Sequence, residues 1–444
     1  MASSSLSRTL GTATDTKKWT NSFWWKPAIG GSQQQIFNVS NGSADNTFFL
    51  VQYRDNAEIR LSAYNTTWLT TNRKFRDYSA WYHVVVVADS TESTASNRLK
   101  LYINGTEETS FATDNRASIS QNQTWGINLA QPHFIGSEGG SGSFIEGSLS
   151  HIHFIDGTAY PASTFGETDA TTGIWKPKTA PSVTYGTNGF FLKGENSSAL
   201  GTDSSGNSNT FTVGGTPTQT VDTPANVFAT LNPVHFGSDV GTVTMSNGNL
   251  TFSNSGSDSW RSSTQAVSSG KYYAEFKTTG VAGAGGVGIN SGAVTGYTGS
   301  GAYDYVYLGN GIVYNNDNNQ GGTFASLSTN DIIGVAVDLD NNKIYFSING
   351  TFQNSADPTS GATGTGAISV ADPSSNGTEF YHFTVGDAGT GTVSFQANFG
   401  NGFFGTTAVA SAQNPDDGIG IFEYDVPAGY RALCTKSINA EEYS

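Results

Sequence analysis

Residues Asp331 to Phe352 read DIIGVAVDLDNNKIYFSINGTF, and this stretch decides the fold. Apolar side chains alternate with small or polar ones on both sides of Asp340-Asn341-Asn342, which is the period of strands with one buried face. Asp and Asn tolerate turn backbone, and Asn349-Gly350 supplies the two positive-φ residues of a type I′ turn. The stretch therefore predicts a long antiparallel hairpin that ends in a second tight turn.

The same pattern recurs through the chain. Residues 81–89 read WYHVVVVAD, and residues 98–106 read RLKLYINGT after a polar loop. Further short stretches of this kind are found at residues 19–25, 35–39, 46–53, 58–64, 133–136, 144–155, 190–192, 248–252, 271–276, 286–289, 303–308, 381–385 and 393–400. Many short strands separated by turn residues predict an all-β fold.

The composition supports this fold class and indicates the number of domains. Charged residues make up 13% of the chain, against the ~25% that is usual, and there are 54 glycines. A single hydrophobic core stops growing at roughly 250–300 residues, so a chain of 444 residues indicates two domains. We predict two tandem antiparallel β-sandwiches with little helix.

Charge, cysteine content and hydropathy argue against several classes of function. The net charge is −15 and the 21 Lys and Arg residues form no run, so a nucleic-acid partner is not expected. Cys434 is the single cysteine, which excludes an intrachain disulfide framework. The opening MASSSLSRTLGTATDTKKWT lacks the features of a secretion signal, and no apolar run approaches the ~20 residues of a membrane-spanning helix. We expect folding in a reducing cytoplasm and no membrane insertion.

The first half of the chain resembles a known family. WYHVVVV, LKLYING, FIG and FIEGSLSHIHFIDGTAY occur between Trp19 and Lys193 in the order of the laminin G-like, concanavalin A-type sandwich. In that family a strand preceded by glycine returns through the core, and Gly147 fits this position. We place this domain at residues 1–195, followed by a Gly-, Ser- and Thr-rich linker at residues 196–226.

The second half resembles a SPRY domain. KYYAEF, GVGI, NDIIGVAVDLDNNKIYFSINGTF and ANFGNGFF occur in the order of that family within residues 227–406. A C-terminal extension, residues 407–444, contains Phe422-Glu423-Tyr424 and resembles the closing segment of structural proteins of marine tailed phages. Those proteins also join a concanavalin-type sandwich to a SPRY-like one, so the resemblance implies a place in a virion.

The sequence contains no complete catalytic motif. Glu167-Thr168-Asp169 begins the E-x-D-x-x-E strand signature of one group of glycoside hydrolases, which place their carboxylates on one face of a strand. Thr172 occupies the position of the last Glu, and the segment is expected to be a polar loop. We name no catalytic residue.

Two further sets of residues are considered as metal ligands. His151 and His153 would share a strand face, with His133 as the third ligand, or else they lie on the solvent side of an edge strand. Asp338 and Asp340 begin a calcium-loop pattern that lacks its bidentate Glu, and turn formation accounts for both. We name no metal ligand and no cofactor. The laminin G-like resemblance implies that calcium could bind, at a position that these residues do not identify.

Aromatic residues near loops are the leading candidates for ligand binding. These candidates are Tyr64, Trp68, Tyr303, Tyr305, Tyr307 and Tyr314. Tyr and Trp present a large face with a polar group, which suits carbohydrate or protein recognition; the alternative is that they belong to the core or to ordinary surface. SPRY domains bind through loops at one end of the sandwich, and by this analogy loops Ser291–Ala302 and Asn315–Thr323 are candidates too.

Together these features predict a non-enzymatic structural or adhesion protein of a tailed-phage virion, as a tail fibre, a tail appendage or a capsid decoration. It would be made in the host cytoplasm and exposed on the particle surface. We expect a homo-oligomer that contacts other virion proteins and a host-surface glycan or protein. Two alternatives remain, namely a secreted or cell-surface carbohydrate-binding lectin and a polysaccharide hydrolase with two carboxylates ~5–10 Å apart.

Overall fold

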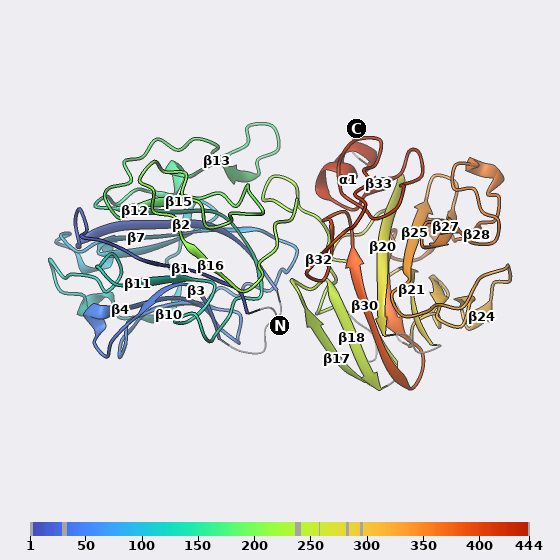
Figure 1. Ribbon diagram of the computed structural model, residues 1–444, viewed down its shortest axis with the longest axis horizontal. Coiled ribbons are helices and arrows are strands. Elements are labelled where there is room, and N and C mark those ends of the chain that lie inside the picture. Colours follow the sequence, from blue (N-terminus) through green and yellow to red (C-terminus); the bar gives the residue numbers. More distant parts are fainter. Residues whose placement is uncertain are drawn as a thin grey trace. The chain divides into compact units, whose positions relative to one another are not determined.

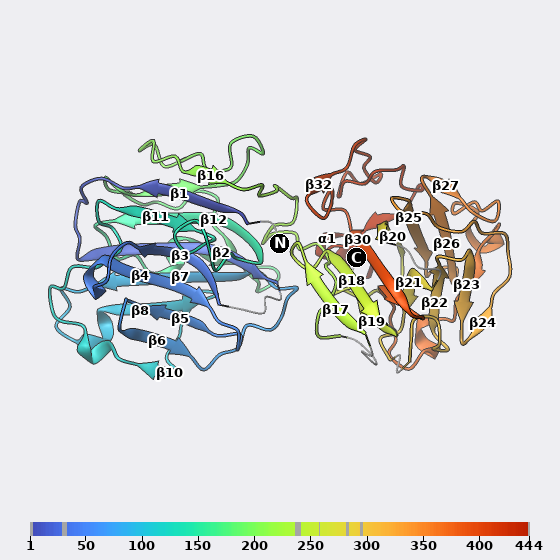
Figure 2. The ribbon, with the colours of Figure 1, turned by 60° about the horizontal axis from the view of Figure 1, so that its bottom comes forward.

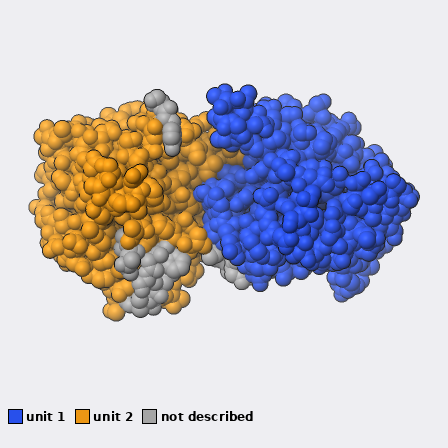
Figure 3. All heavy atoms as spheres, turned by 180° about the vertical axis from the view of Figure 1, so that it is seen from behind, with its two compact units in different colours: residues 1–219 blue, residues 220–444 orange. Residues whose placement is uncertain are grey.

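The computed structural model describes residues 3–28, 33–235, 241–256, 258–280, 284–293 and 296–442 (Figure 1). The chain divides into two compact units, unit 1 (residues 1–219) and unit 2 (residues 220–444), which Figure 3 colours separately. Each unit contains two large sheets of mainly antiparallel strands. Within the described ranges the one α-helix is α1 (Thr435–Glu442), and no helix there is long and apolar enough to cross a membrane. The predicted fold class is confirmed.

Unit 1 pairs an eight-stranded sheet with a six-stranded one. The larger sheet has the order β10-β6-β5-β4-β3-β11-β1-β16, and its strands are β1 (Ser5–Thr9), β3 (Gln34–Ser40), β4 (Phe48–Tyr53), β5 (Ile59–Ser62), β6 (Thr67–Thr71), β10 (Phe111–Asp114), β11 (Pro132–Ile135) and β16 (Thr212–Gly214). The smaller sheet has the order β15-β12-β2-β7-β8-β9, and its strands are β2 (Lys18–Pro27), β7 (Tyr82–Asp89), β8 (Leu99–Ile103), β9 (Thr106–Glu107), β12 (Gly147–Asp156) and β15 (Phe190–Leu192). A separate hairpin consists of β13 (Gly166–Thr168) and β14 (Trp175–Pro177).

The core of unit 1 lies between these two sheets. Alternate side chains of a strand share one face, and β2 sends Trp19, Phe23 and Trp25 into the core. Trp19 packs edge-on against Phe49 of β4, with ring centroids 5.1 Å apart. Because β2 and β4 belong to different sheets, this contact joins the two layers of a sandwich.

The predicted linker at residues 196–226 differs from the observed arrangement, in which residues 196–219 form part of unit 1. Strand β16 pairs with β1, and Phe211 is buried in the core of unit 1. The carboxylate of Asp203 accepts hydrogen bonds from the backbone N–H groups of Phe191 and Asn209, at 2.9 and 2.7 Å. This polar segment is therefore held mainly by hydrogen bonds, which a composition rule for linkers does not detect.

Unit 2 has the same two-layer plan. Its larger sheet has the path β17-β18-β30-β20-β25-β26-β27, with two further short strands, and consists of β17 (Thr242–Ser246), β18 (Thr251–Gly256), β20 (Lys271–Gly280), β25 (Ile332–Asp338), β26 (Lys343–Ile348), β27 (Thr351–Phe352), β28 (Ile368–Ser369), β30 (Gly391–Asn398) and β33 (Arg431–Ala432). Its smaller sheet has the order β19-β29-β21-β22-β23-β24, with β19 (Ser259–Ser262), β21 (Gly285–Asn290), β22 (Asp304–Leu308), β23 (Ile312–Asn315), β24 (Asn318–Asn319) and β29 (His382–Asp387). A separate hairpin consists of β31 (Phe403–Phe404) and β32 (Thr407–Ala408).

The hairpin that was predicted first is present as β25 and β26. Val335 pairs with Phe346 and Val337 pairs with Ile344, so the apolar residues of both strands share the core face. The following turn, Asn349-Gly350, has φ angles of 48° and 80°, the positive values that a type I′ turn requires. This prediction is confirmed.

The described part of the predicted C-terminal extension (residues 407–444), which ends at residue 442, packs onto the larger sheet of unit 2. Phe422 lies edge-on to Tyr273, with ring centroids 5.1 Å apart, and β33 pairs with β20 in parallel. Beneath this segment the buried carboxyl group of Glu275 accepts hydrogen bonds from the backbone N–H groups of Glu423 and Tyr424, both at 2.9 Å. Burial raises the pKa of Glu275 to about 7.

Candidate functional site

The two candidate loops of unit 2 lie against each other. Tyr297, in the loop between β21 and β22, donates its hydroxyl hydrogen to Oδ1 of Asp317, in the turn between β23 and β24. The backbone N–H of Asn316 donates to the carbonyl of Gly301 at 3.0 Å. Asn316 and Asp317 have φ angles of 51° and 60°, so they form a two-residue turn of the I′ type. We define the loop face as Tyr297, Tyr314 and Asp317.

Buried side chains hold the first of these loops. Nε1 of Trp260 donates to the carbonyl of Gly296 at 3.2 Å. Asp304, the first residue of β22, is buried, and its Oδ2 accepts a hydrogen bond from the backbone N–H of Gly299 at 2.5 Å. Burial raises the pKa of Asp304 to about 7. Residues 294 and 295 of the predicted loop Ser291–Ala302 lie outside the described residues.

The two tyrosines of β22, Tyr305 and Tyr307, face the core, so the alternative of a core role holds for them rather than ligand binding. Tyr305 is 5% exposed and Tyr307 is fully buried, so neither can reach a ligand. Tyr303 keeps part of its side chain exposed and donates its hydroxyl hydrogen to the carbonyl of Ser375 at 2.9 Å. Tyr314 of β23 is partly exposed and lies beside the loop that carries Tyr297. Of the predicted tyrosines in unit 2, Tyr314 is therefore the one that the structure places on the loop face.

In unit 1 the two predicted aromatic residues have different environments. Tyr64 lies in the bend between β5 and β6, is 48% exposed and packs edge-on against Phe48 at a centroid distance of 5.6 Å. Asp45 holds this bend by accepting a hydrogen bond from the backbone N–H of Asn65 at 2.6 Å. Trp68 is 4% exposed and belongs to the hydrophobic core. Trp68 is thus a packing residue, and Tyr64 remains a candidate for binding.

A buried serine–histidine pair in unit 1 has the spacing of a hydrolytic dyad but the opposite proton arrangement. Oγ of Ser22 lies 2.9 Å from Nε2 of His83, and both residues are buried. Nε1 of Trp175 donates to Nδ1 of His83 at 3.0 Å, which makes Nδ1 the acceptor and leaves the ring proton on Nε2. His83 therefore donates to Ser22 and cannot accept its proton, as a general base must. Burial lowers the pKa of His83 to about 3 and keeps the ring neutral.

Strand β12 overturns both interpretations of its histidines. It lies between β15 and β2, so it is not an edge strand. A bulge between Ser150 and His153 gives His151 a φ of 48° and interrupts the alternation of side chains. His153 is buried and stacks on Phe191 with a centroid distance of 3.9 Å. His133 is buried as well, and no three His, Cys, Asp or Glu side chains of the described chain are grouped to hold a metal ion.

The incomplete hydrolase pattern lies in the β13–β14 hairpin. Glu167 is in β13, which is a strand where a loop was expected, and Asp169 is in the turn that follows. Asp169 accepts hydrogen bonds from the backbone N–H groups of Thr171 and Thr172, at 3.0 and 2.9 Å, and pairs with Lys176 at 2.8 Å. The hydrogen bond from Lys176 lowers the pKa of Asp169. These contacts give Asp169 a turn-forming role.

The aspartates that resembled a calcium loop are occupied by hydrogen-bond donors. Asp338 accepts a hydrogen bond from the backbone N–H of Asn341 at 3.0 Å and pairs with Lys271 at 3.3 Å. Asp340 accepts one from the backbone N–H of Gly270 at 2.8 Å. These bonds use the carboxylate of Asp338 and one oxygen of Asp340 to hold the turn and the neighbouring strands, which gives both residues a structural role.

A buried aspartate of unit 1, Asp156, is satisfied in the same way. Asp156 accepts hydrogen bonds from the backbone N–H groups of Thr14, Asp15 and Asn188, at 2.7, 3.2 and 3.0 Å. Nδ2 of Asn128 donates to it at 2.7 Å. Four donors fill the acceptor positions of this carboxylate, so it stabilises the surrounding loops and offers no free oxygen to a cation.

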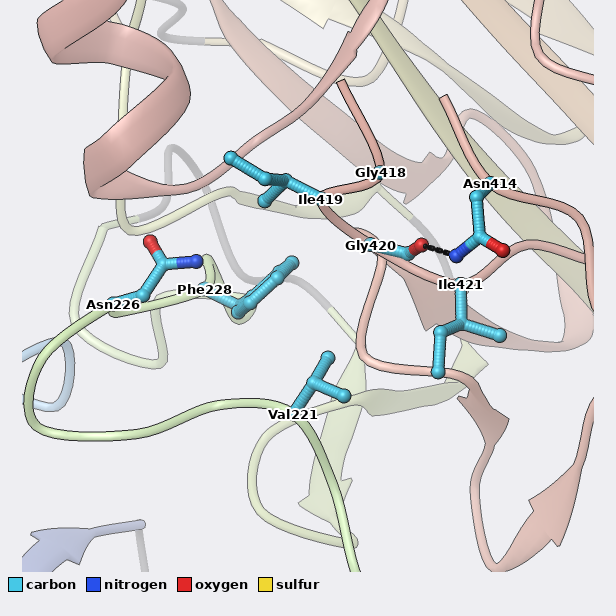
Figure 4. Close-up of a pocket in the computed structure, with 8 residues that line it drawn as sticks. All are labelled: Val221, Asn226, Phe228, Asn414, Gly418, Ile419, Gly420 and Ile421. Carbon is cyan, nitrogen blue, oxygen red and sulfur yellow. Dashed lines mark hydrogen bonds between the residues drawn. The ribbon is translucent and has the colours of Figure 1, made fainter. Parts of the chain in front are cut away.

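Unit 2 also has a pocket of about 270 Å³ (Figure 4). It is lined by Val221, Asn226, Phe228, Asn414, Gly418, Ile419, Gly420 and Ile421. Nδ2 of Asn414 donates to the carbonyl of Gly420 at 2.5 Å. These lining residues include no acid, base or nucleophile, so they supply no group for acid–base or nucleophilic chemistry.

The comparisons with known proteins concern the fold. Residues 3–163 match a family model, Laminin_G_3, described as the concanavalin A-like lectin/glucanases superfamily. This match covers much of unit 1 and agrees with the sandwich seen there. No curated protein matches the sequence.

Several solved structures are similar to parts of the chain. The SPRY domain of human HERC1 is 16% identical and aligns over 38% of this chain and 96% of its own, with a TM-score of 0.29. The heptameric SAP-like pentraxin of Limulus polyphemus is 16% identical over 40% of this chain and 86% of its own, with a TM-score of 0.28. A protein of Bacteroides ovatus, for which carbohydrate binding has been suggested, is 13% identical over 50% of this chain and 58% of its own, with a TM-score of 0.32.

Proposed function

We propose that the chain is a non-enzymatic structural and adhesion protein of a tailed-phage particle, and that its sandwiches act as lectin-like binding modules for a host-surface glycan or protein. The observation that carries the binding proposal is the loop face of unit 2, where two loops join through Tyr297 and Asp317 beside the partly exposed Tyr314. The particle assignment rests on the resemblance of the whole chain to structural proteins of marine tailed phages.

The chemistry of the loop face suits a carbohydrate. The rings of Tyr297 and Tyr314 offer apolar faces to the C–H groups of a sugar, and the carboxylate of Asp317 can accept hydrogen bonds from sugar hydroxyls. Buried contacts from Trp260 and Asp304 anchor Gly296 and Gly299 of this loop before a ligand arrives. Loop residues that are already anchored lose less conformational entropy on binding, which favours affinity.

The proposal of a non-enzymatic role rests on the state of the candidate catalytic groups. His83 holds its proton toward Ser22, and Asp169 is engaged with Lys176 and its own turn. A glycoside hydrolase needs one carboxyl that donates a proton and one that acts as base or nucleophile, both facing the substrate. Neither of these sets supplies such a pair.

A glycan array probed with the full chain tests the binding proposal. We expect binding to a limited set of glycans, a loss of at least about tenfold in affinity for Tyr314→Ala, and no loss for Trp68→Phe, a change within the core. Failure of every glycan to bind, or equal binding by Tyr314→Ala and the parent chain, would contradict a lectin role of the loop face. The matched variant is Tyr64→Ala, which removes an exposed tyrosine of unit 1. Its affinity shows whether unit 1 binds glycans separately.

Purified particles test the virion assignment and separate it from the alternative of a secreted or cell-surface lectin. We expect the chain in particle preparations by mass spectrometry, and density for two β-sandwiches on the particle exterior by electron cryo-microscopy. A chain that binds glycans but is absent from particles supports the alternative.

A further inference from the structure

Strand β17 is one edge of the larger sheet of unit 2, and within the described part of the chain no strand pairs with its outer side. It pairs with β18 on one side over its five residues (Figure 2). No hydrogen bond joins the other side of β17 to any residue that the structure describes. The N–H and C=O groups of an unpaired edge are a template on which another strand can add.

The other edges of the four large sheets are protected by familiar means. β9, β24 and β27 have two residues each, and β15 and β16 have three each. β10 has a register shift and carries Asp114 paired with Arg116, and β19 is buried throughout. Short strands, bulges and charges prevent unwanted pairing of edges. β17, which reads TVTMS, is regular along its whole length and lacks charge, proline and glycine.

We propose that β17 is the interface of a homodimer, in which two copies of the chain pair their β17 strands antiparallel about a two-fold axis at Thr244. This pairing would join the two larger sheets of unit 2 into one continuous sheet. It goes beyond the proposed function, since it does not depend on which ligand the loop face binds.

The side chains of β17 define one register for this dimer. Val243 and Met245 are partly buried against the core of unit 2, whereas Thr242 and Thr244 are exposed on the opposite face. With the axis at Thr244, Val243 lies opposite Met245 of the second copy, and Thr242 lies opposite Ser246. This register pairs all five residues and sets apolar against apolar and hydroxyl against hydroxyl, while a shift by one residue mixes the two faces.

Disulfide trapping tests the register, and the chain is suited to it because its single cysteine, Cys434, is buried. Opposed residues of antiparallel strands have Cα atoms about 4.5–5.5 Å apart, within the span of a disulfide. We expect Thr244→Cys to form a covalent dimer under mild oxidation. Thr242→Cys is the matched control on the same exposed face. Its two copies would lie about 13 Å apart along the strands, so it should stay monomeric when the gel is run without reductant.

Charge substitution tests the interface without a crosslink. Thr244→Lys and Thr244→Glu place like charges opposite each other across the axis, and each should weaken self-association at least about tenfold in analytical ultracentrifugation. Mixing the two variants should restore dimers, because the opposed charges then attract. Equal crosslinking of Thr242→Cys and Thr244→Cys would overturn the proposal, and so would unchanged self-association of both charge variants. A monomeric parent chain at every concentration would overturn it as well.

Discussion

The hydroxyl of Tyr297 donates a hydrogen bond to the carboxylate of Asp317, and this bond links two loops that lie twenty residues apart in the sequence. The first loop precedes β22 and the second joins β23 to β24, so strand pairing brings their bases together. The bond ties the side chain of Tyr297 to the turn that follows Tyr314, and the geometry of the loop face depends on this link.

Replacing Tyr297 with Phe should weaken glycan binding more than it weakens the fold. The ring and its packing remain, but Asp317 loses a donor and the loop gains freedom, so we expect affinity to fall severalfold. The stability change should be less than about 1 kcal/mol, because the bond is near the surface. Calorimetric titration with a glycan from the array and urea unfolding measure the two effects.

Asp317→Ala and the double variant complete a thermodynamic cycle for this prediction. If the bond acts as proposed, the losses of affinity from Tyr297→Phe and Asp317→Ala will not add, because each removes the same link. Fully additive losses would show that the two side chains contact the ligand independently.

Substitution of the two candidate aromatic residues of unit 1, Trp68 and Tyr64, should distinguish a core residue from a surface residue by the change in unfolding free energy. Trp68→Ala removes a ring from the core and should lower the free energy of unfolding by about 3–5 kcal/mol. Tyr64→Ala changes a side chain that is 48% exposed and should alter it by less than about 0.5 kcal/mol. Urea titration followed by tryptophan fluorescence and far-UV circular dichroism measures both. A large loss for Tyr64→Ala would mean that its contact with Phe48 is structural.

The buried carboxyl of Glu275 makes the stability of unit 2 depend on pH. Its pKa is about 7 in the folded chain, against 4.5 for an ordinary Glu, so the folded state holds a proton that the unfolded chain releases between these values. The contribution of Glu275 is therefore full below pH 4.5 and is lost as the pH rises to about 7, by on the order of 3 kcal/mol.

The variant Glu275→Gln isolates this contribution, because its side chain does not titrate. The difference in unfolding free energy between the parent chain and the variant should shrink as the pH rises from 4.5 to 7 and should then stay constant. A difference that is independent of pH would show that Glu275 has an ordinary pKa despite its burial. Denaturant unfolding at several pH values gives the curve.

Removal of divalent cations should leave the melting temperature unchanged. Asp156, Asp338 and Asp340 bind N–H groups or an ammonium group, so a cation would have to displace bonds already made. Thermal unfolding with EDTA, with calcium and with magnesium checks this. A fall of several degrees in EDTA that calcium alone reverses would reveal a calcium site elsewhere in the chain.

The hairpin of β25 and β26 could be predicted because its information is local. Alternation fixed the faces of Val335 and Phe346, and Asn349-Gly350 fixed the turn, so no distant contact was needed. The tyrosines in and just before β22 show where local information ends. Period-two alternation places Tyr303, Tyr305 and Tyr307 on one face, but only the packing of the second sheet decides that this face is the core.

The candidate site depends on contacts between distant residues, which the sequence pattern does not contain. The bond from Tyr297 to Asp317 and the anchoring of the loop by Trp260 arise only after the strands have paired. The prediction that His151 and His153 share a strand face assumed regular alternation of side chains. The bulge at His151 interrupts that alternation. A run of five consecutive Asn and Asp residues, Asn315 to Asn319, was the visible signal that a tight loop borders Tyr314.

Strand β1 lies between β11 and β16, so residues at the start of unit 1 complete their pairing with residues near its end. During synthesis Ser7 of β1 leaves the ribosome about two hundred residues before its partner Thr212, so β1 must wait for this second pairing. Until then its second edge is bare, at the stage when many nascent chains on one message are crowded together. Newly made copies are therefore exposed to mispairing for most of the time that unit 1 takes to be translated, and slower elongation before residue 212 should lengthen that period.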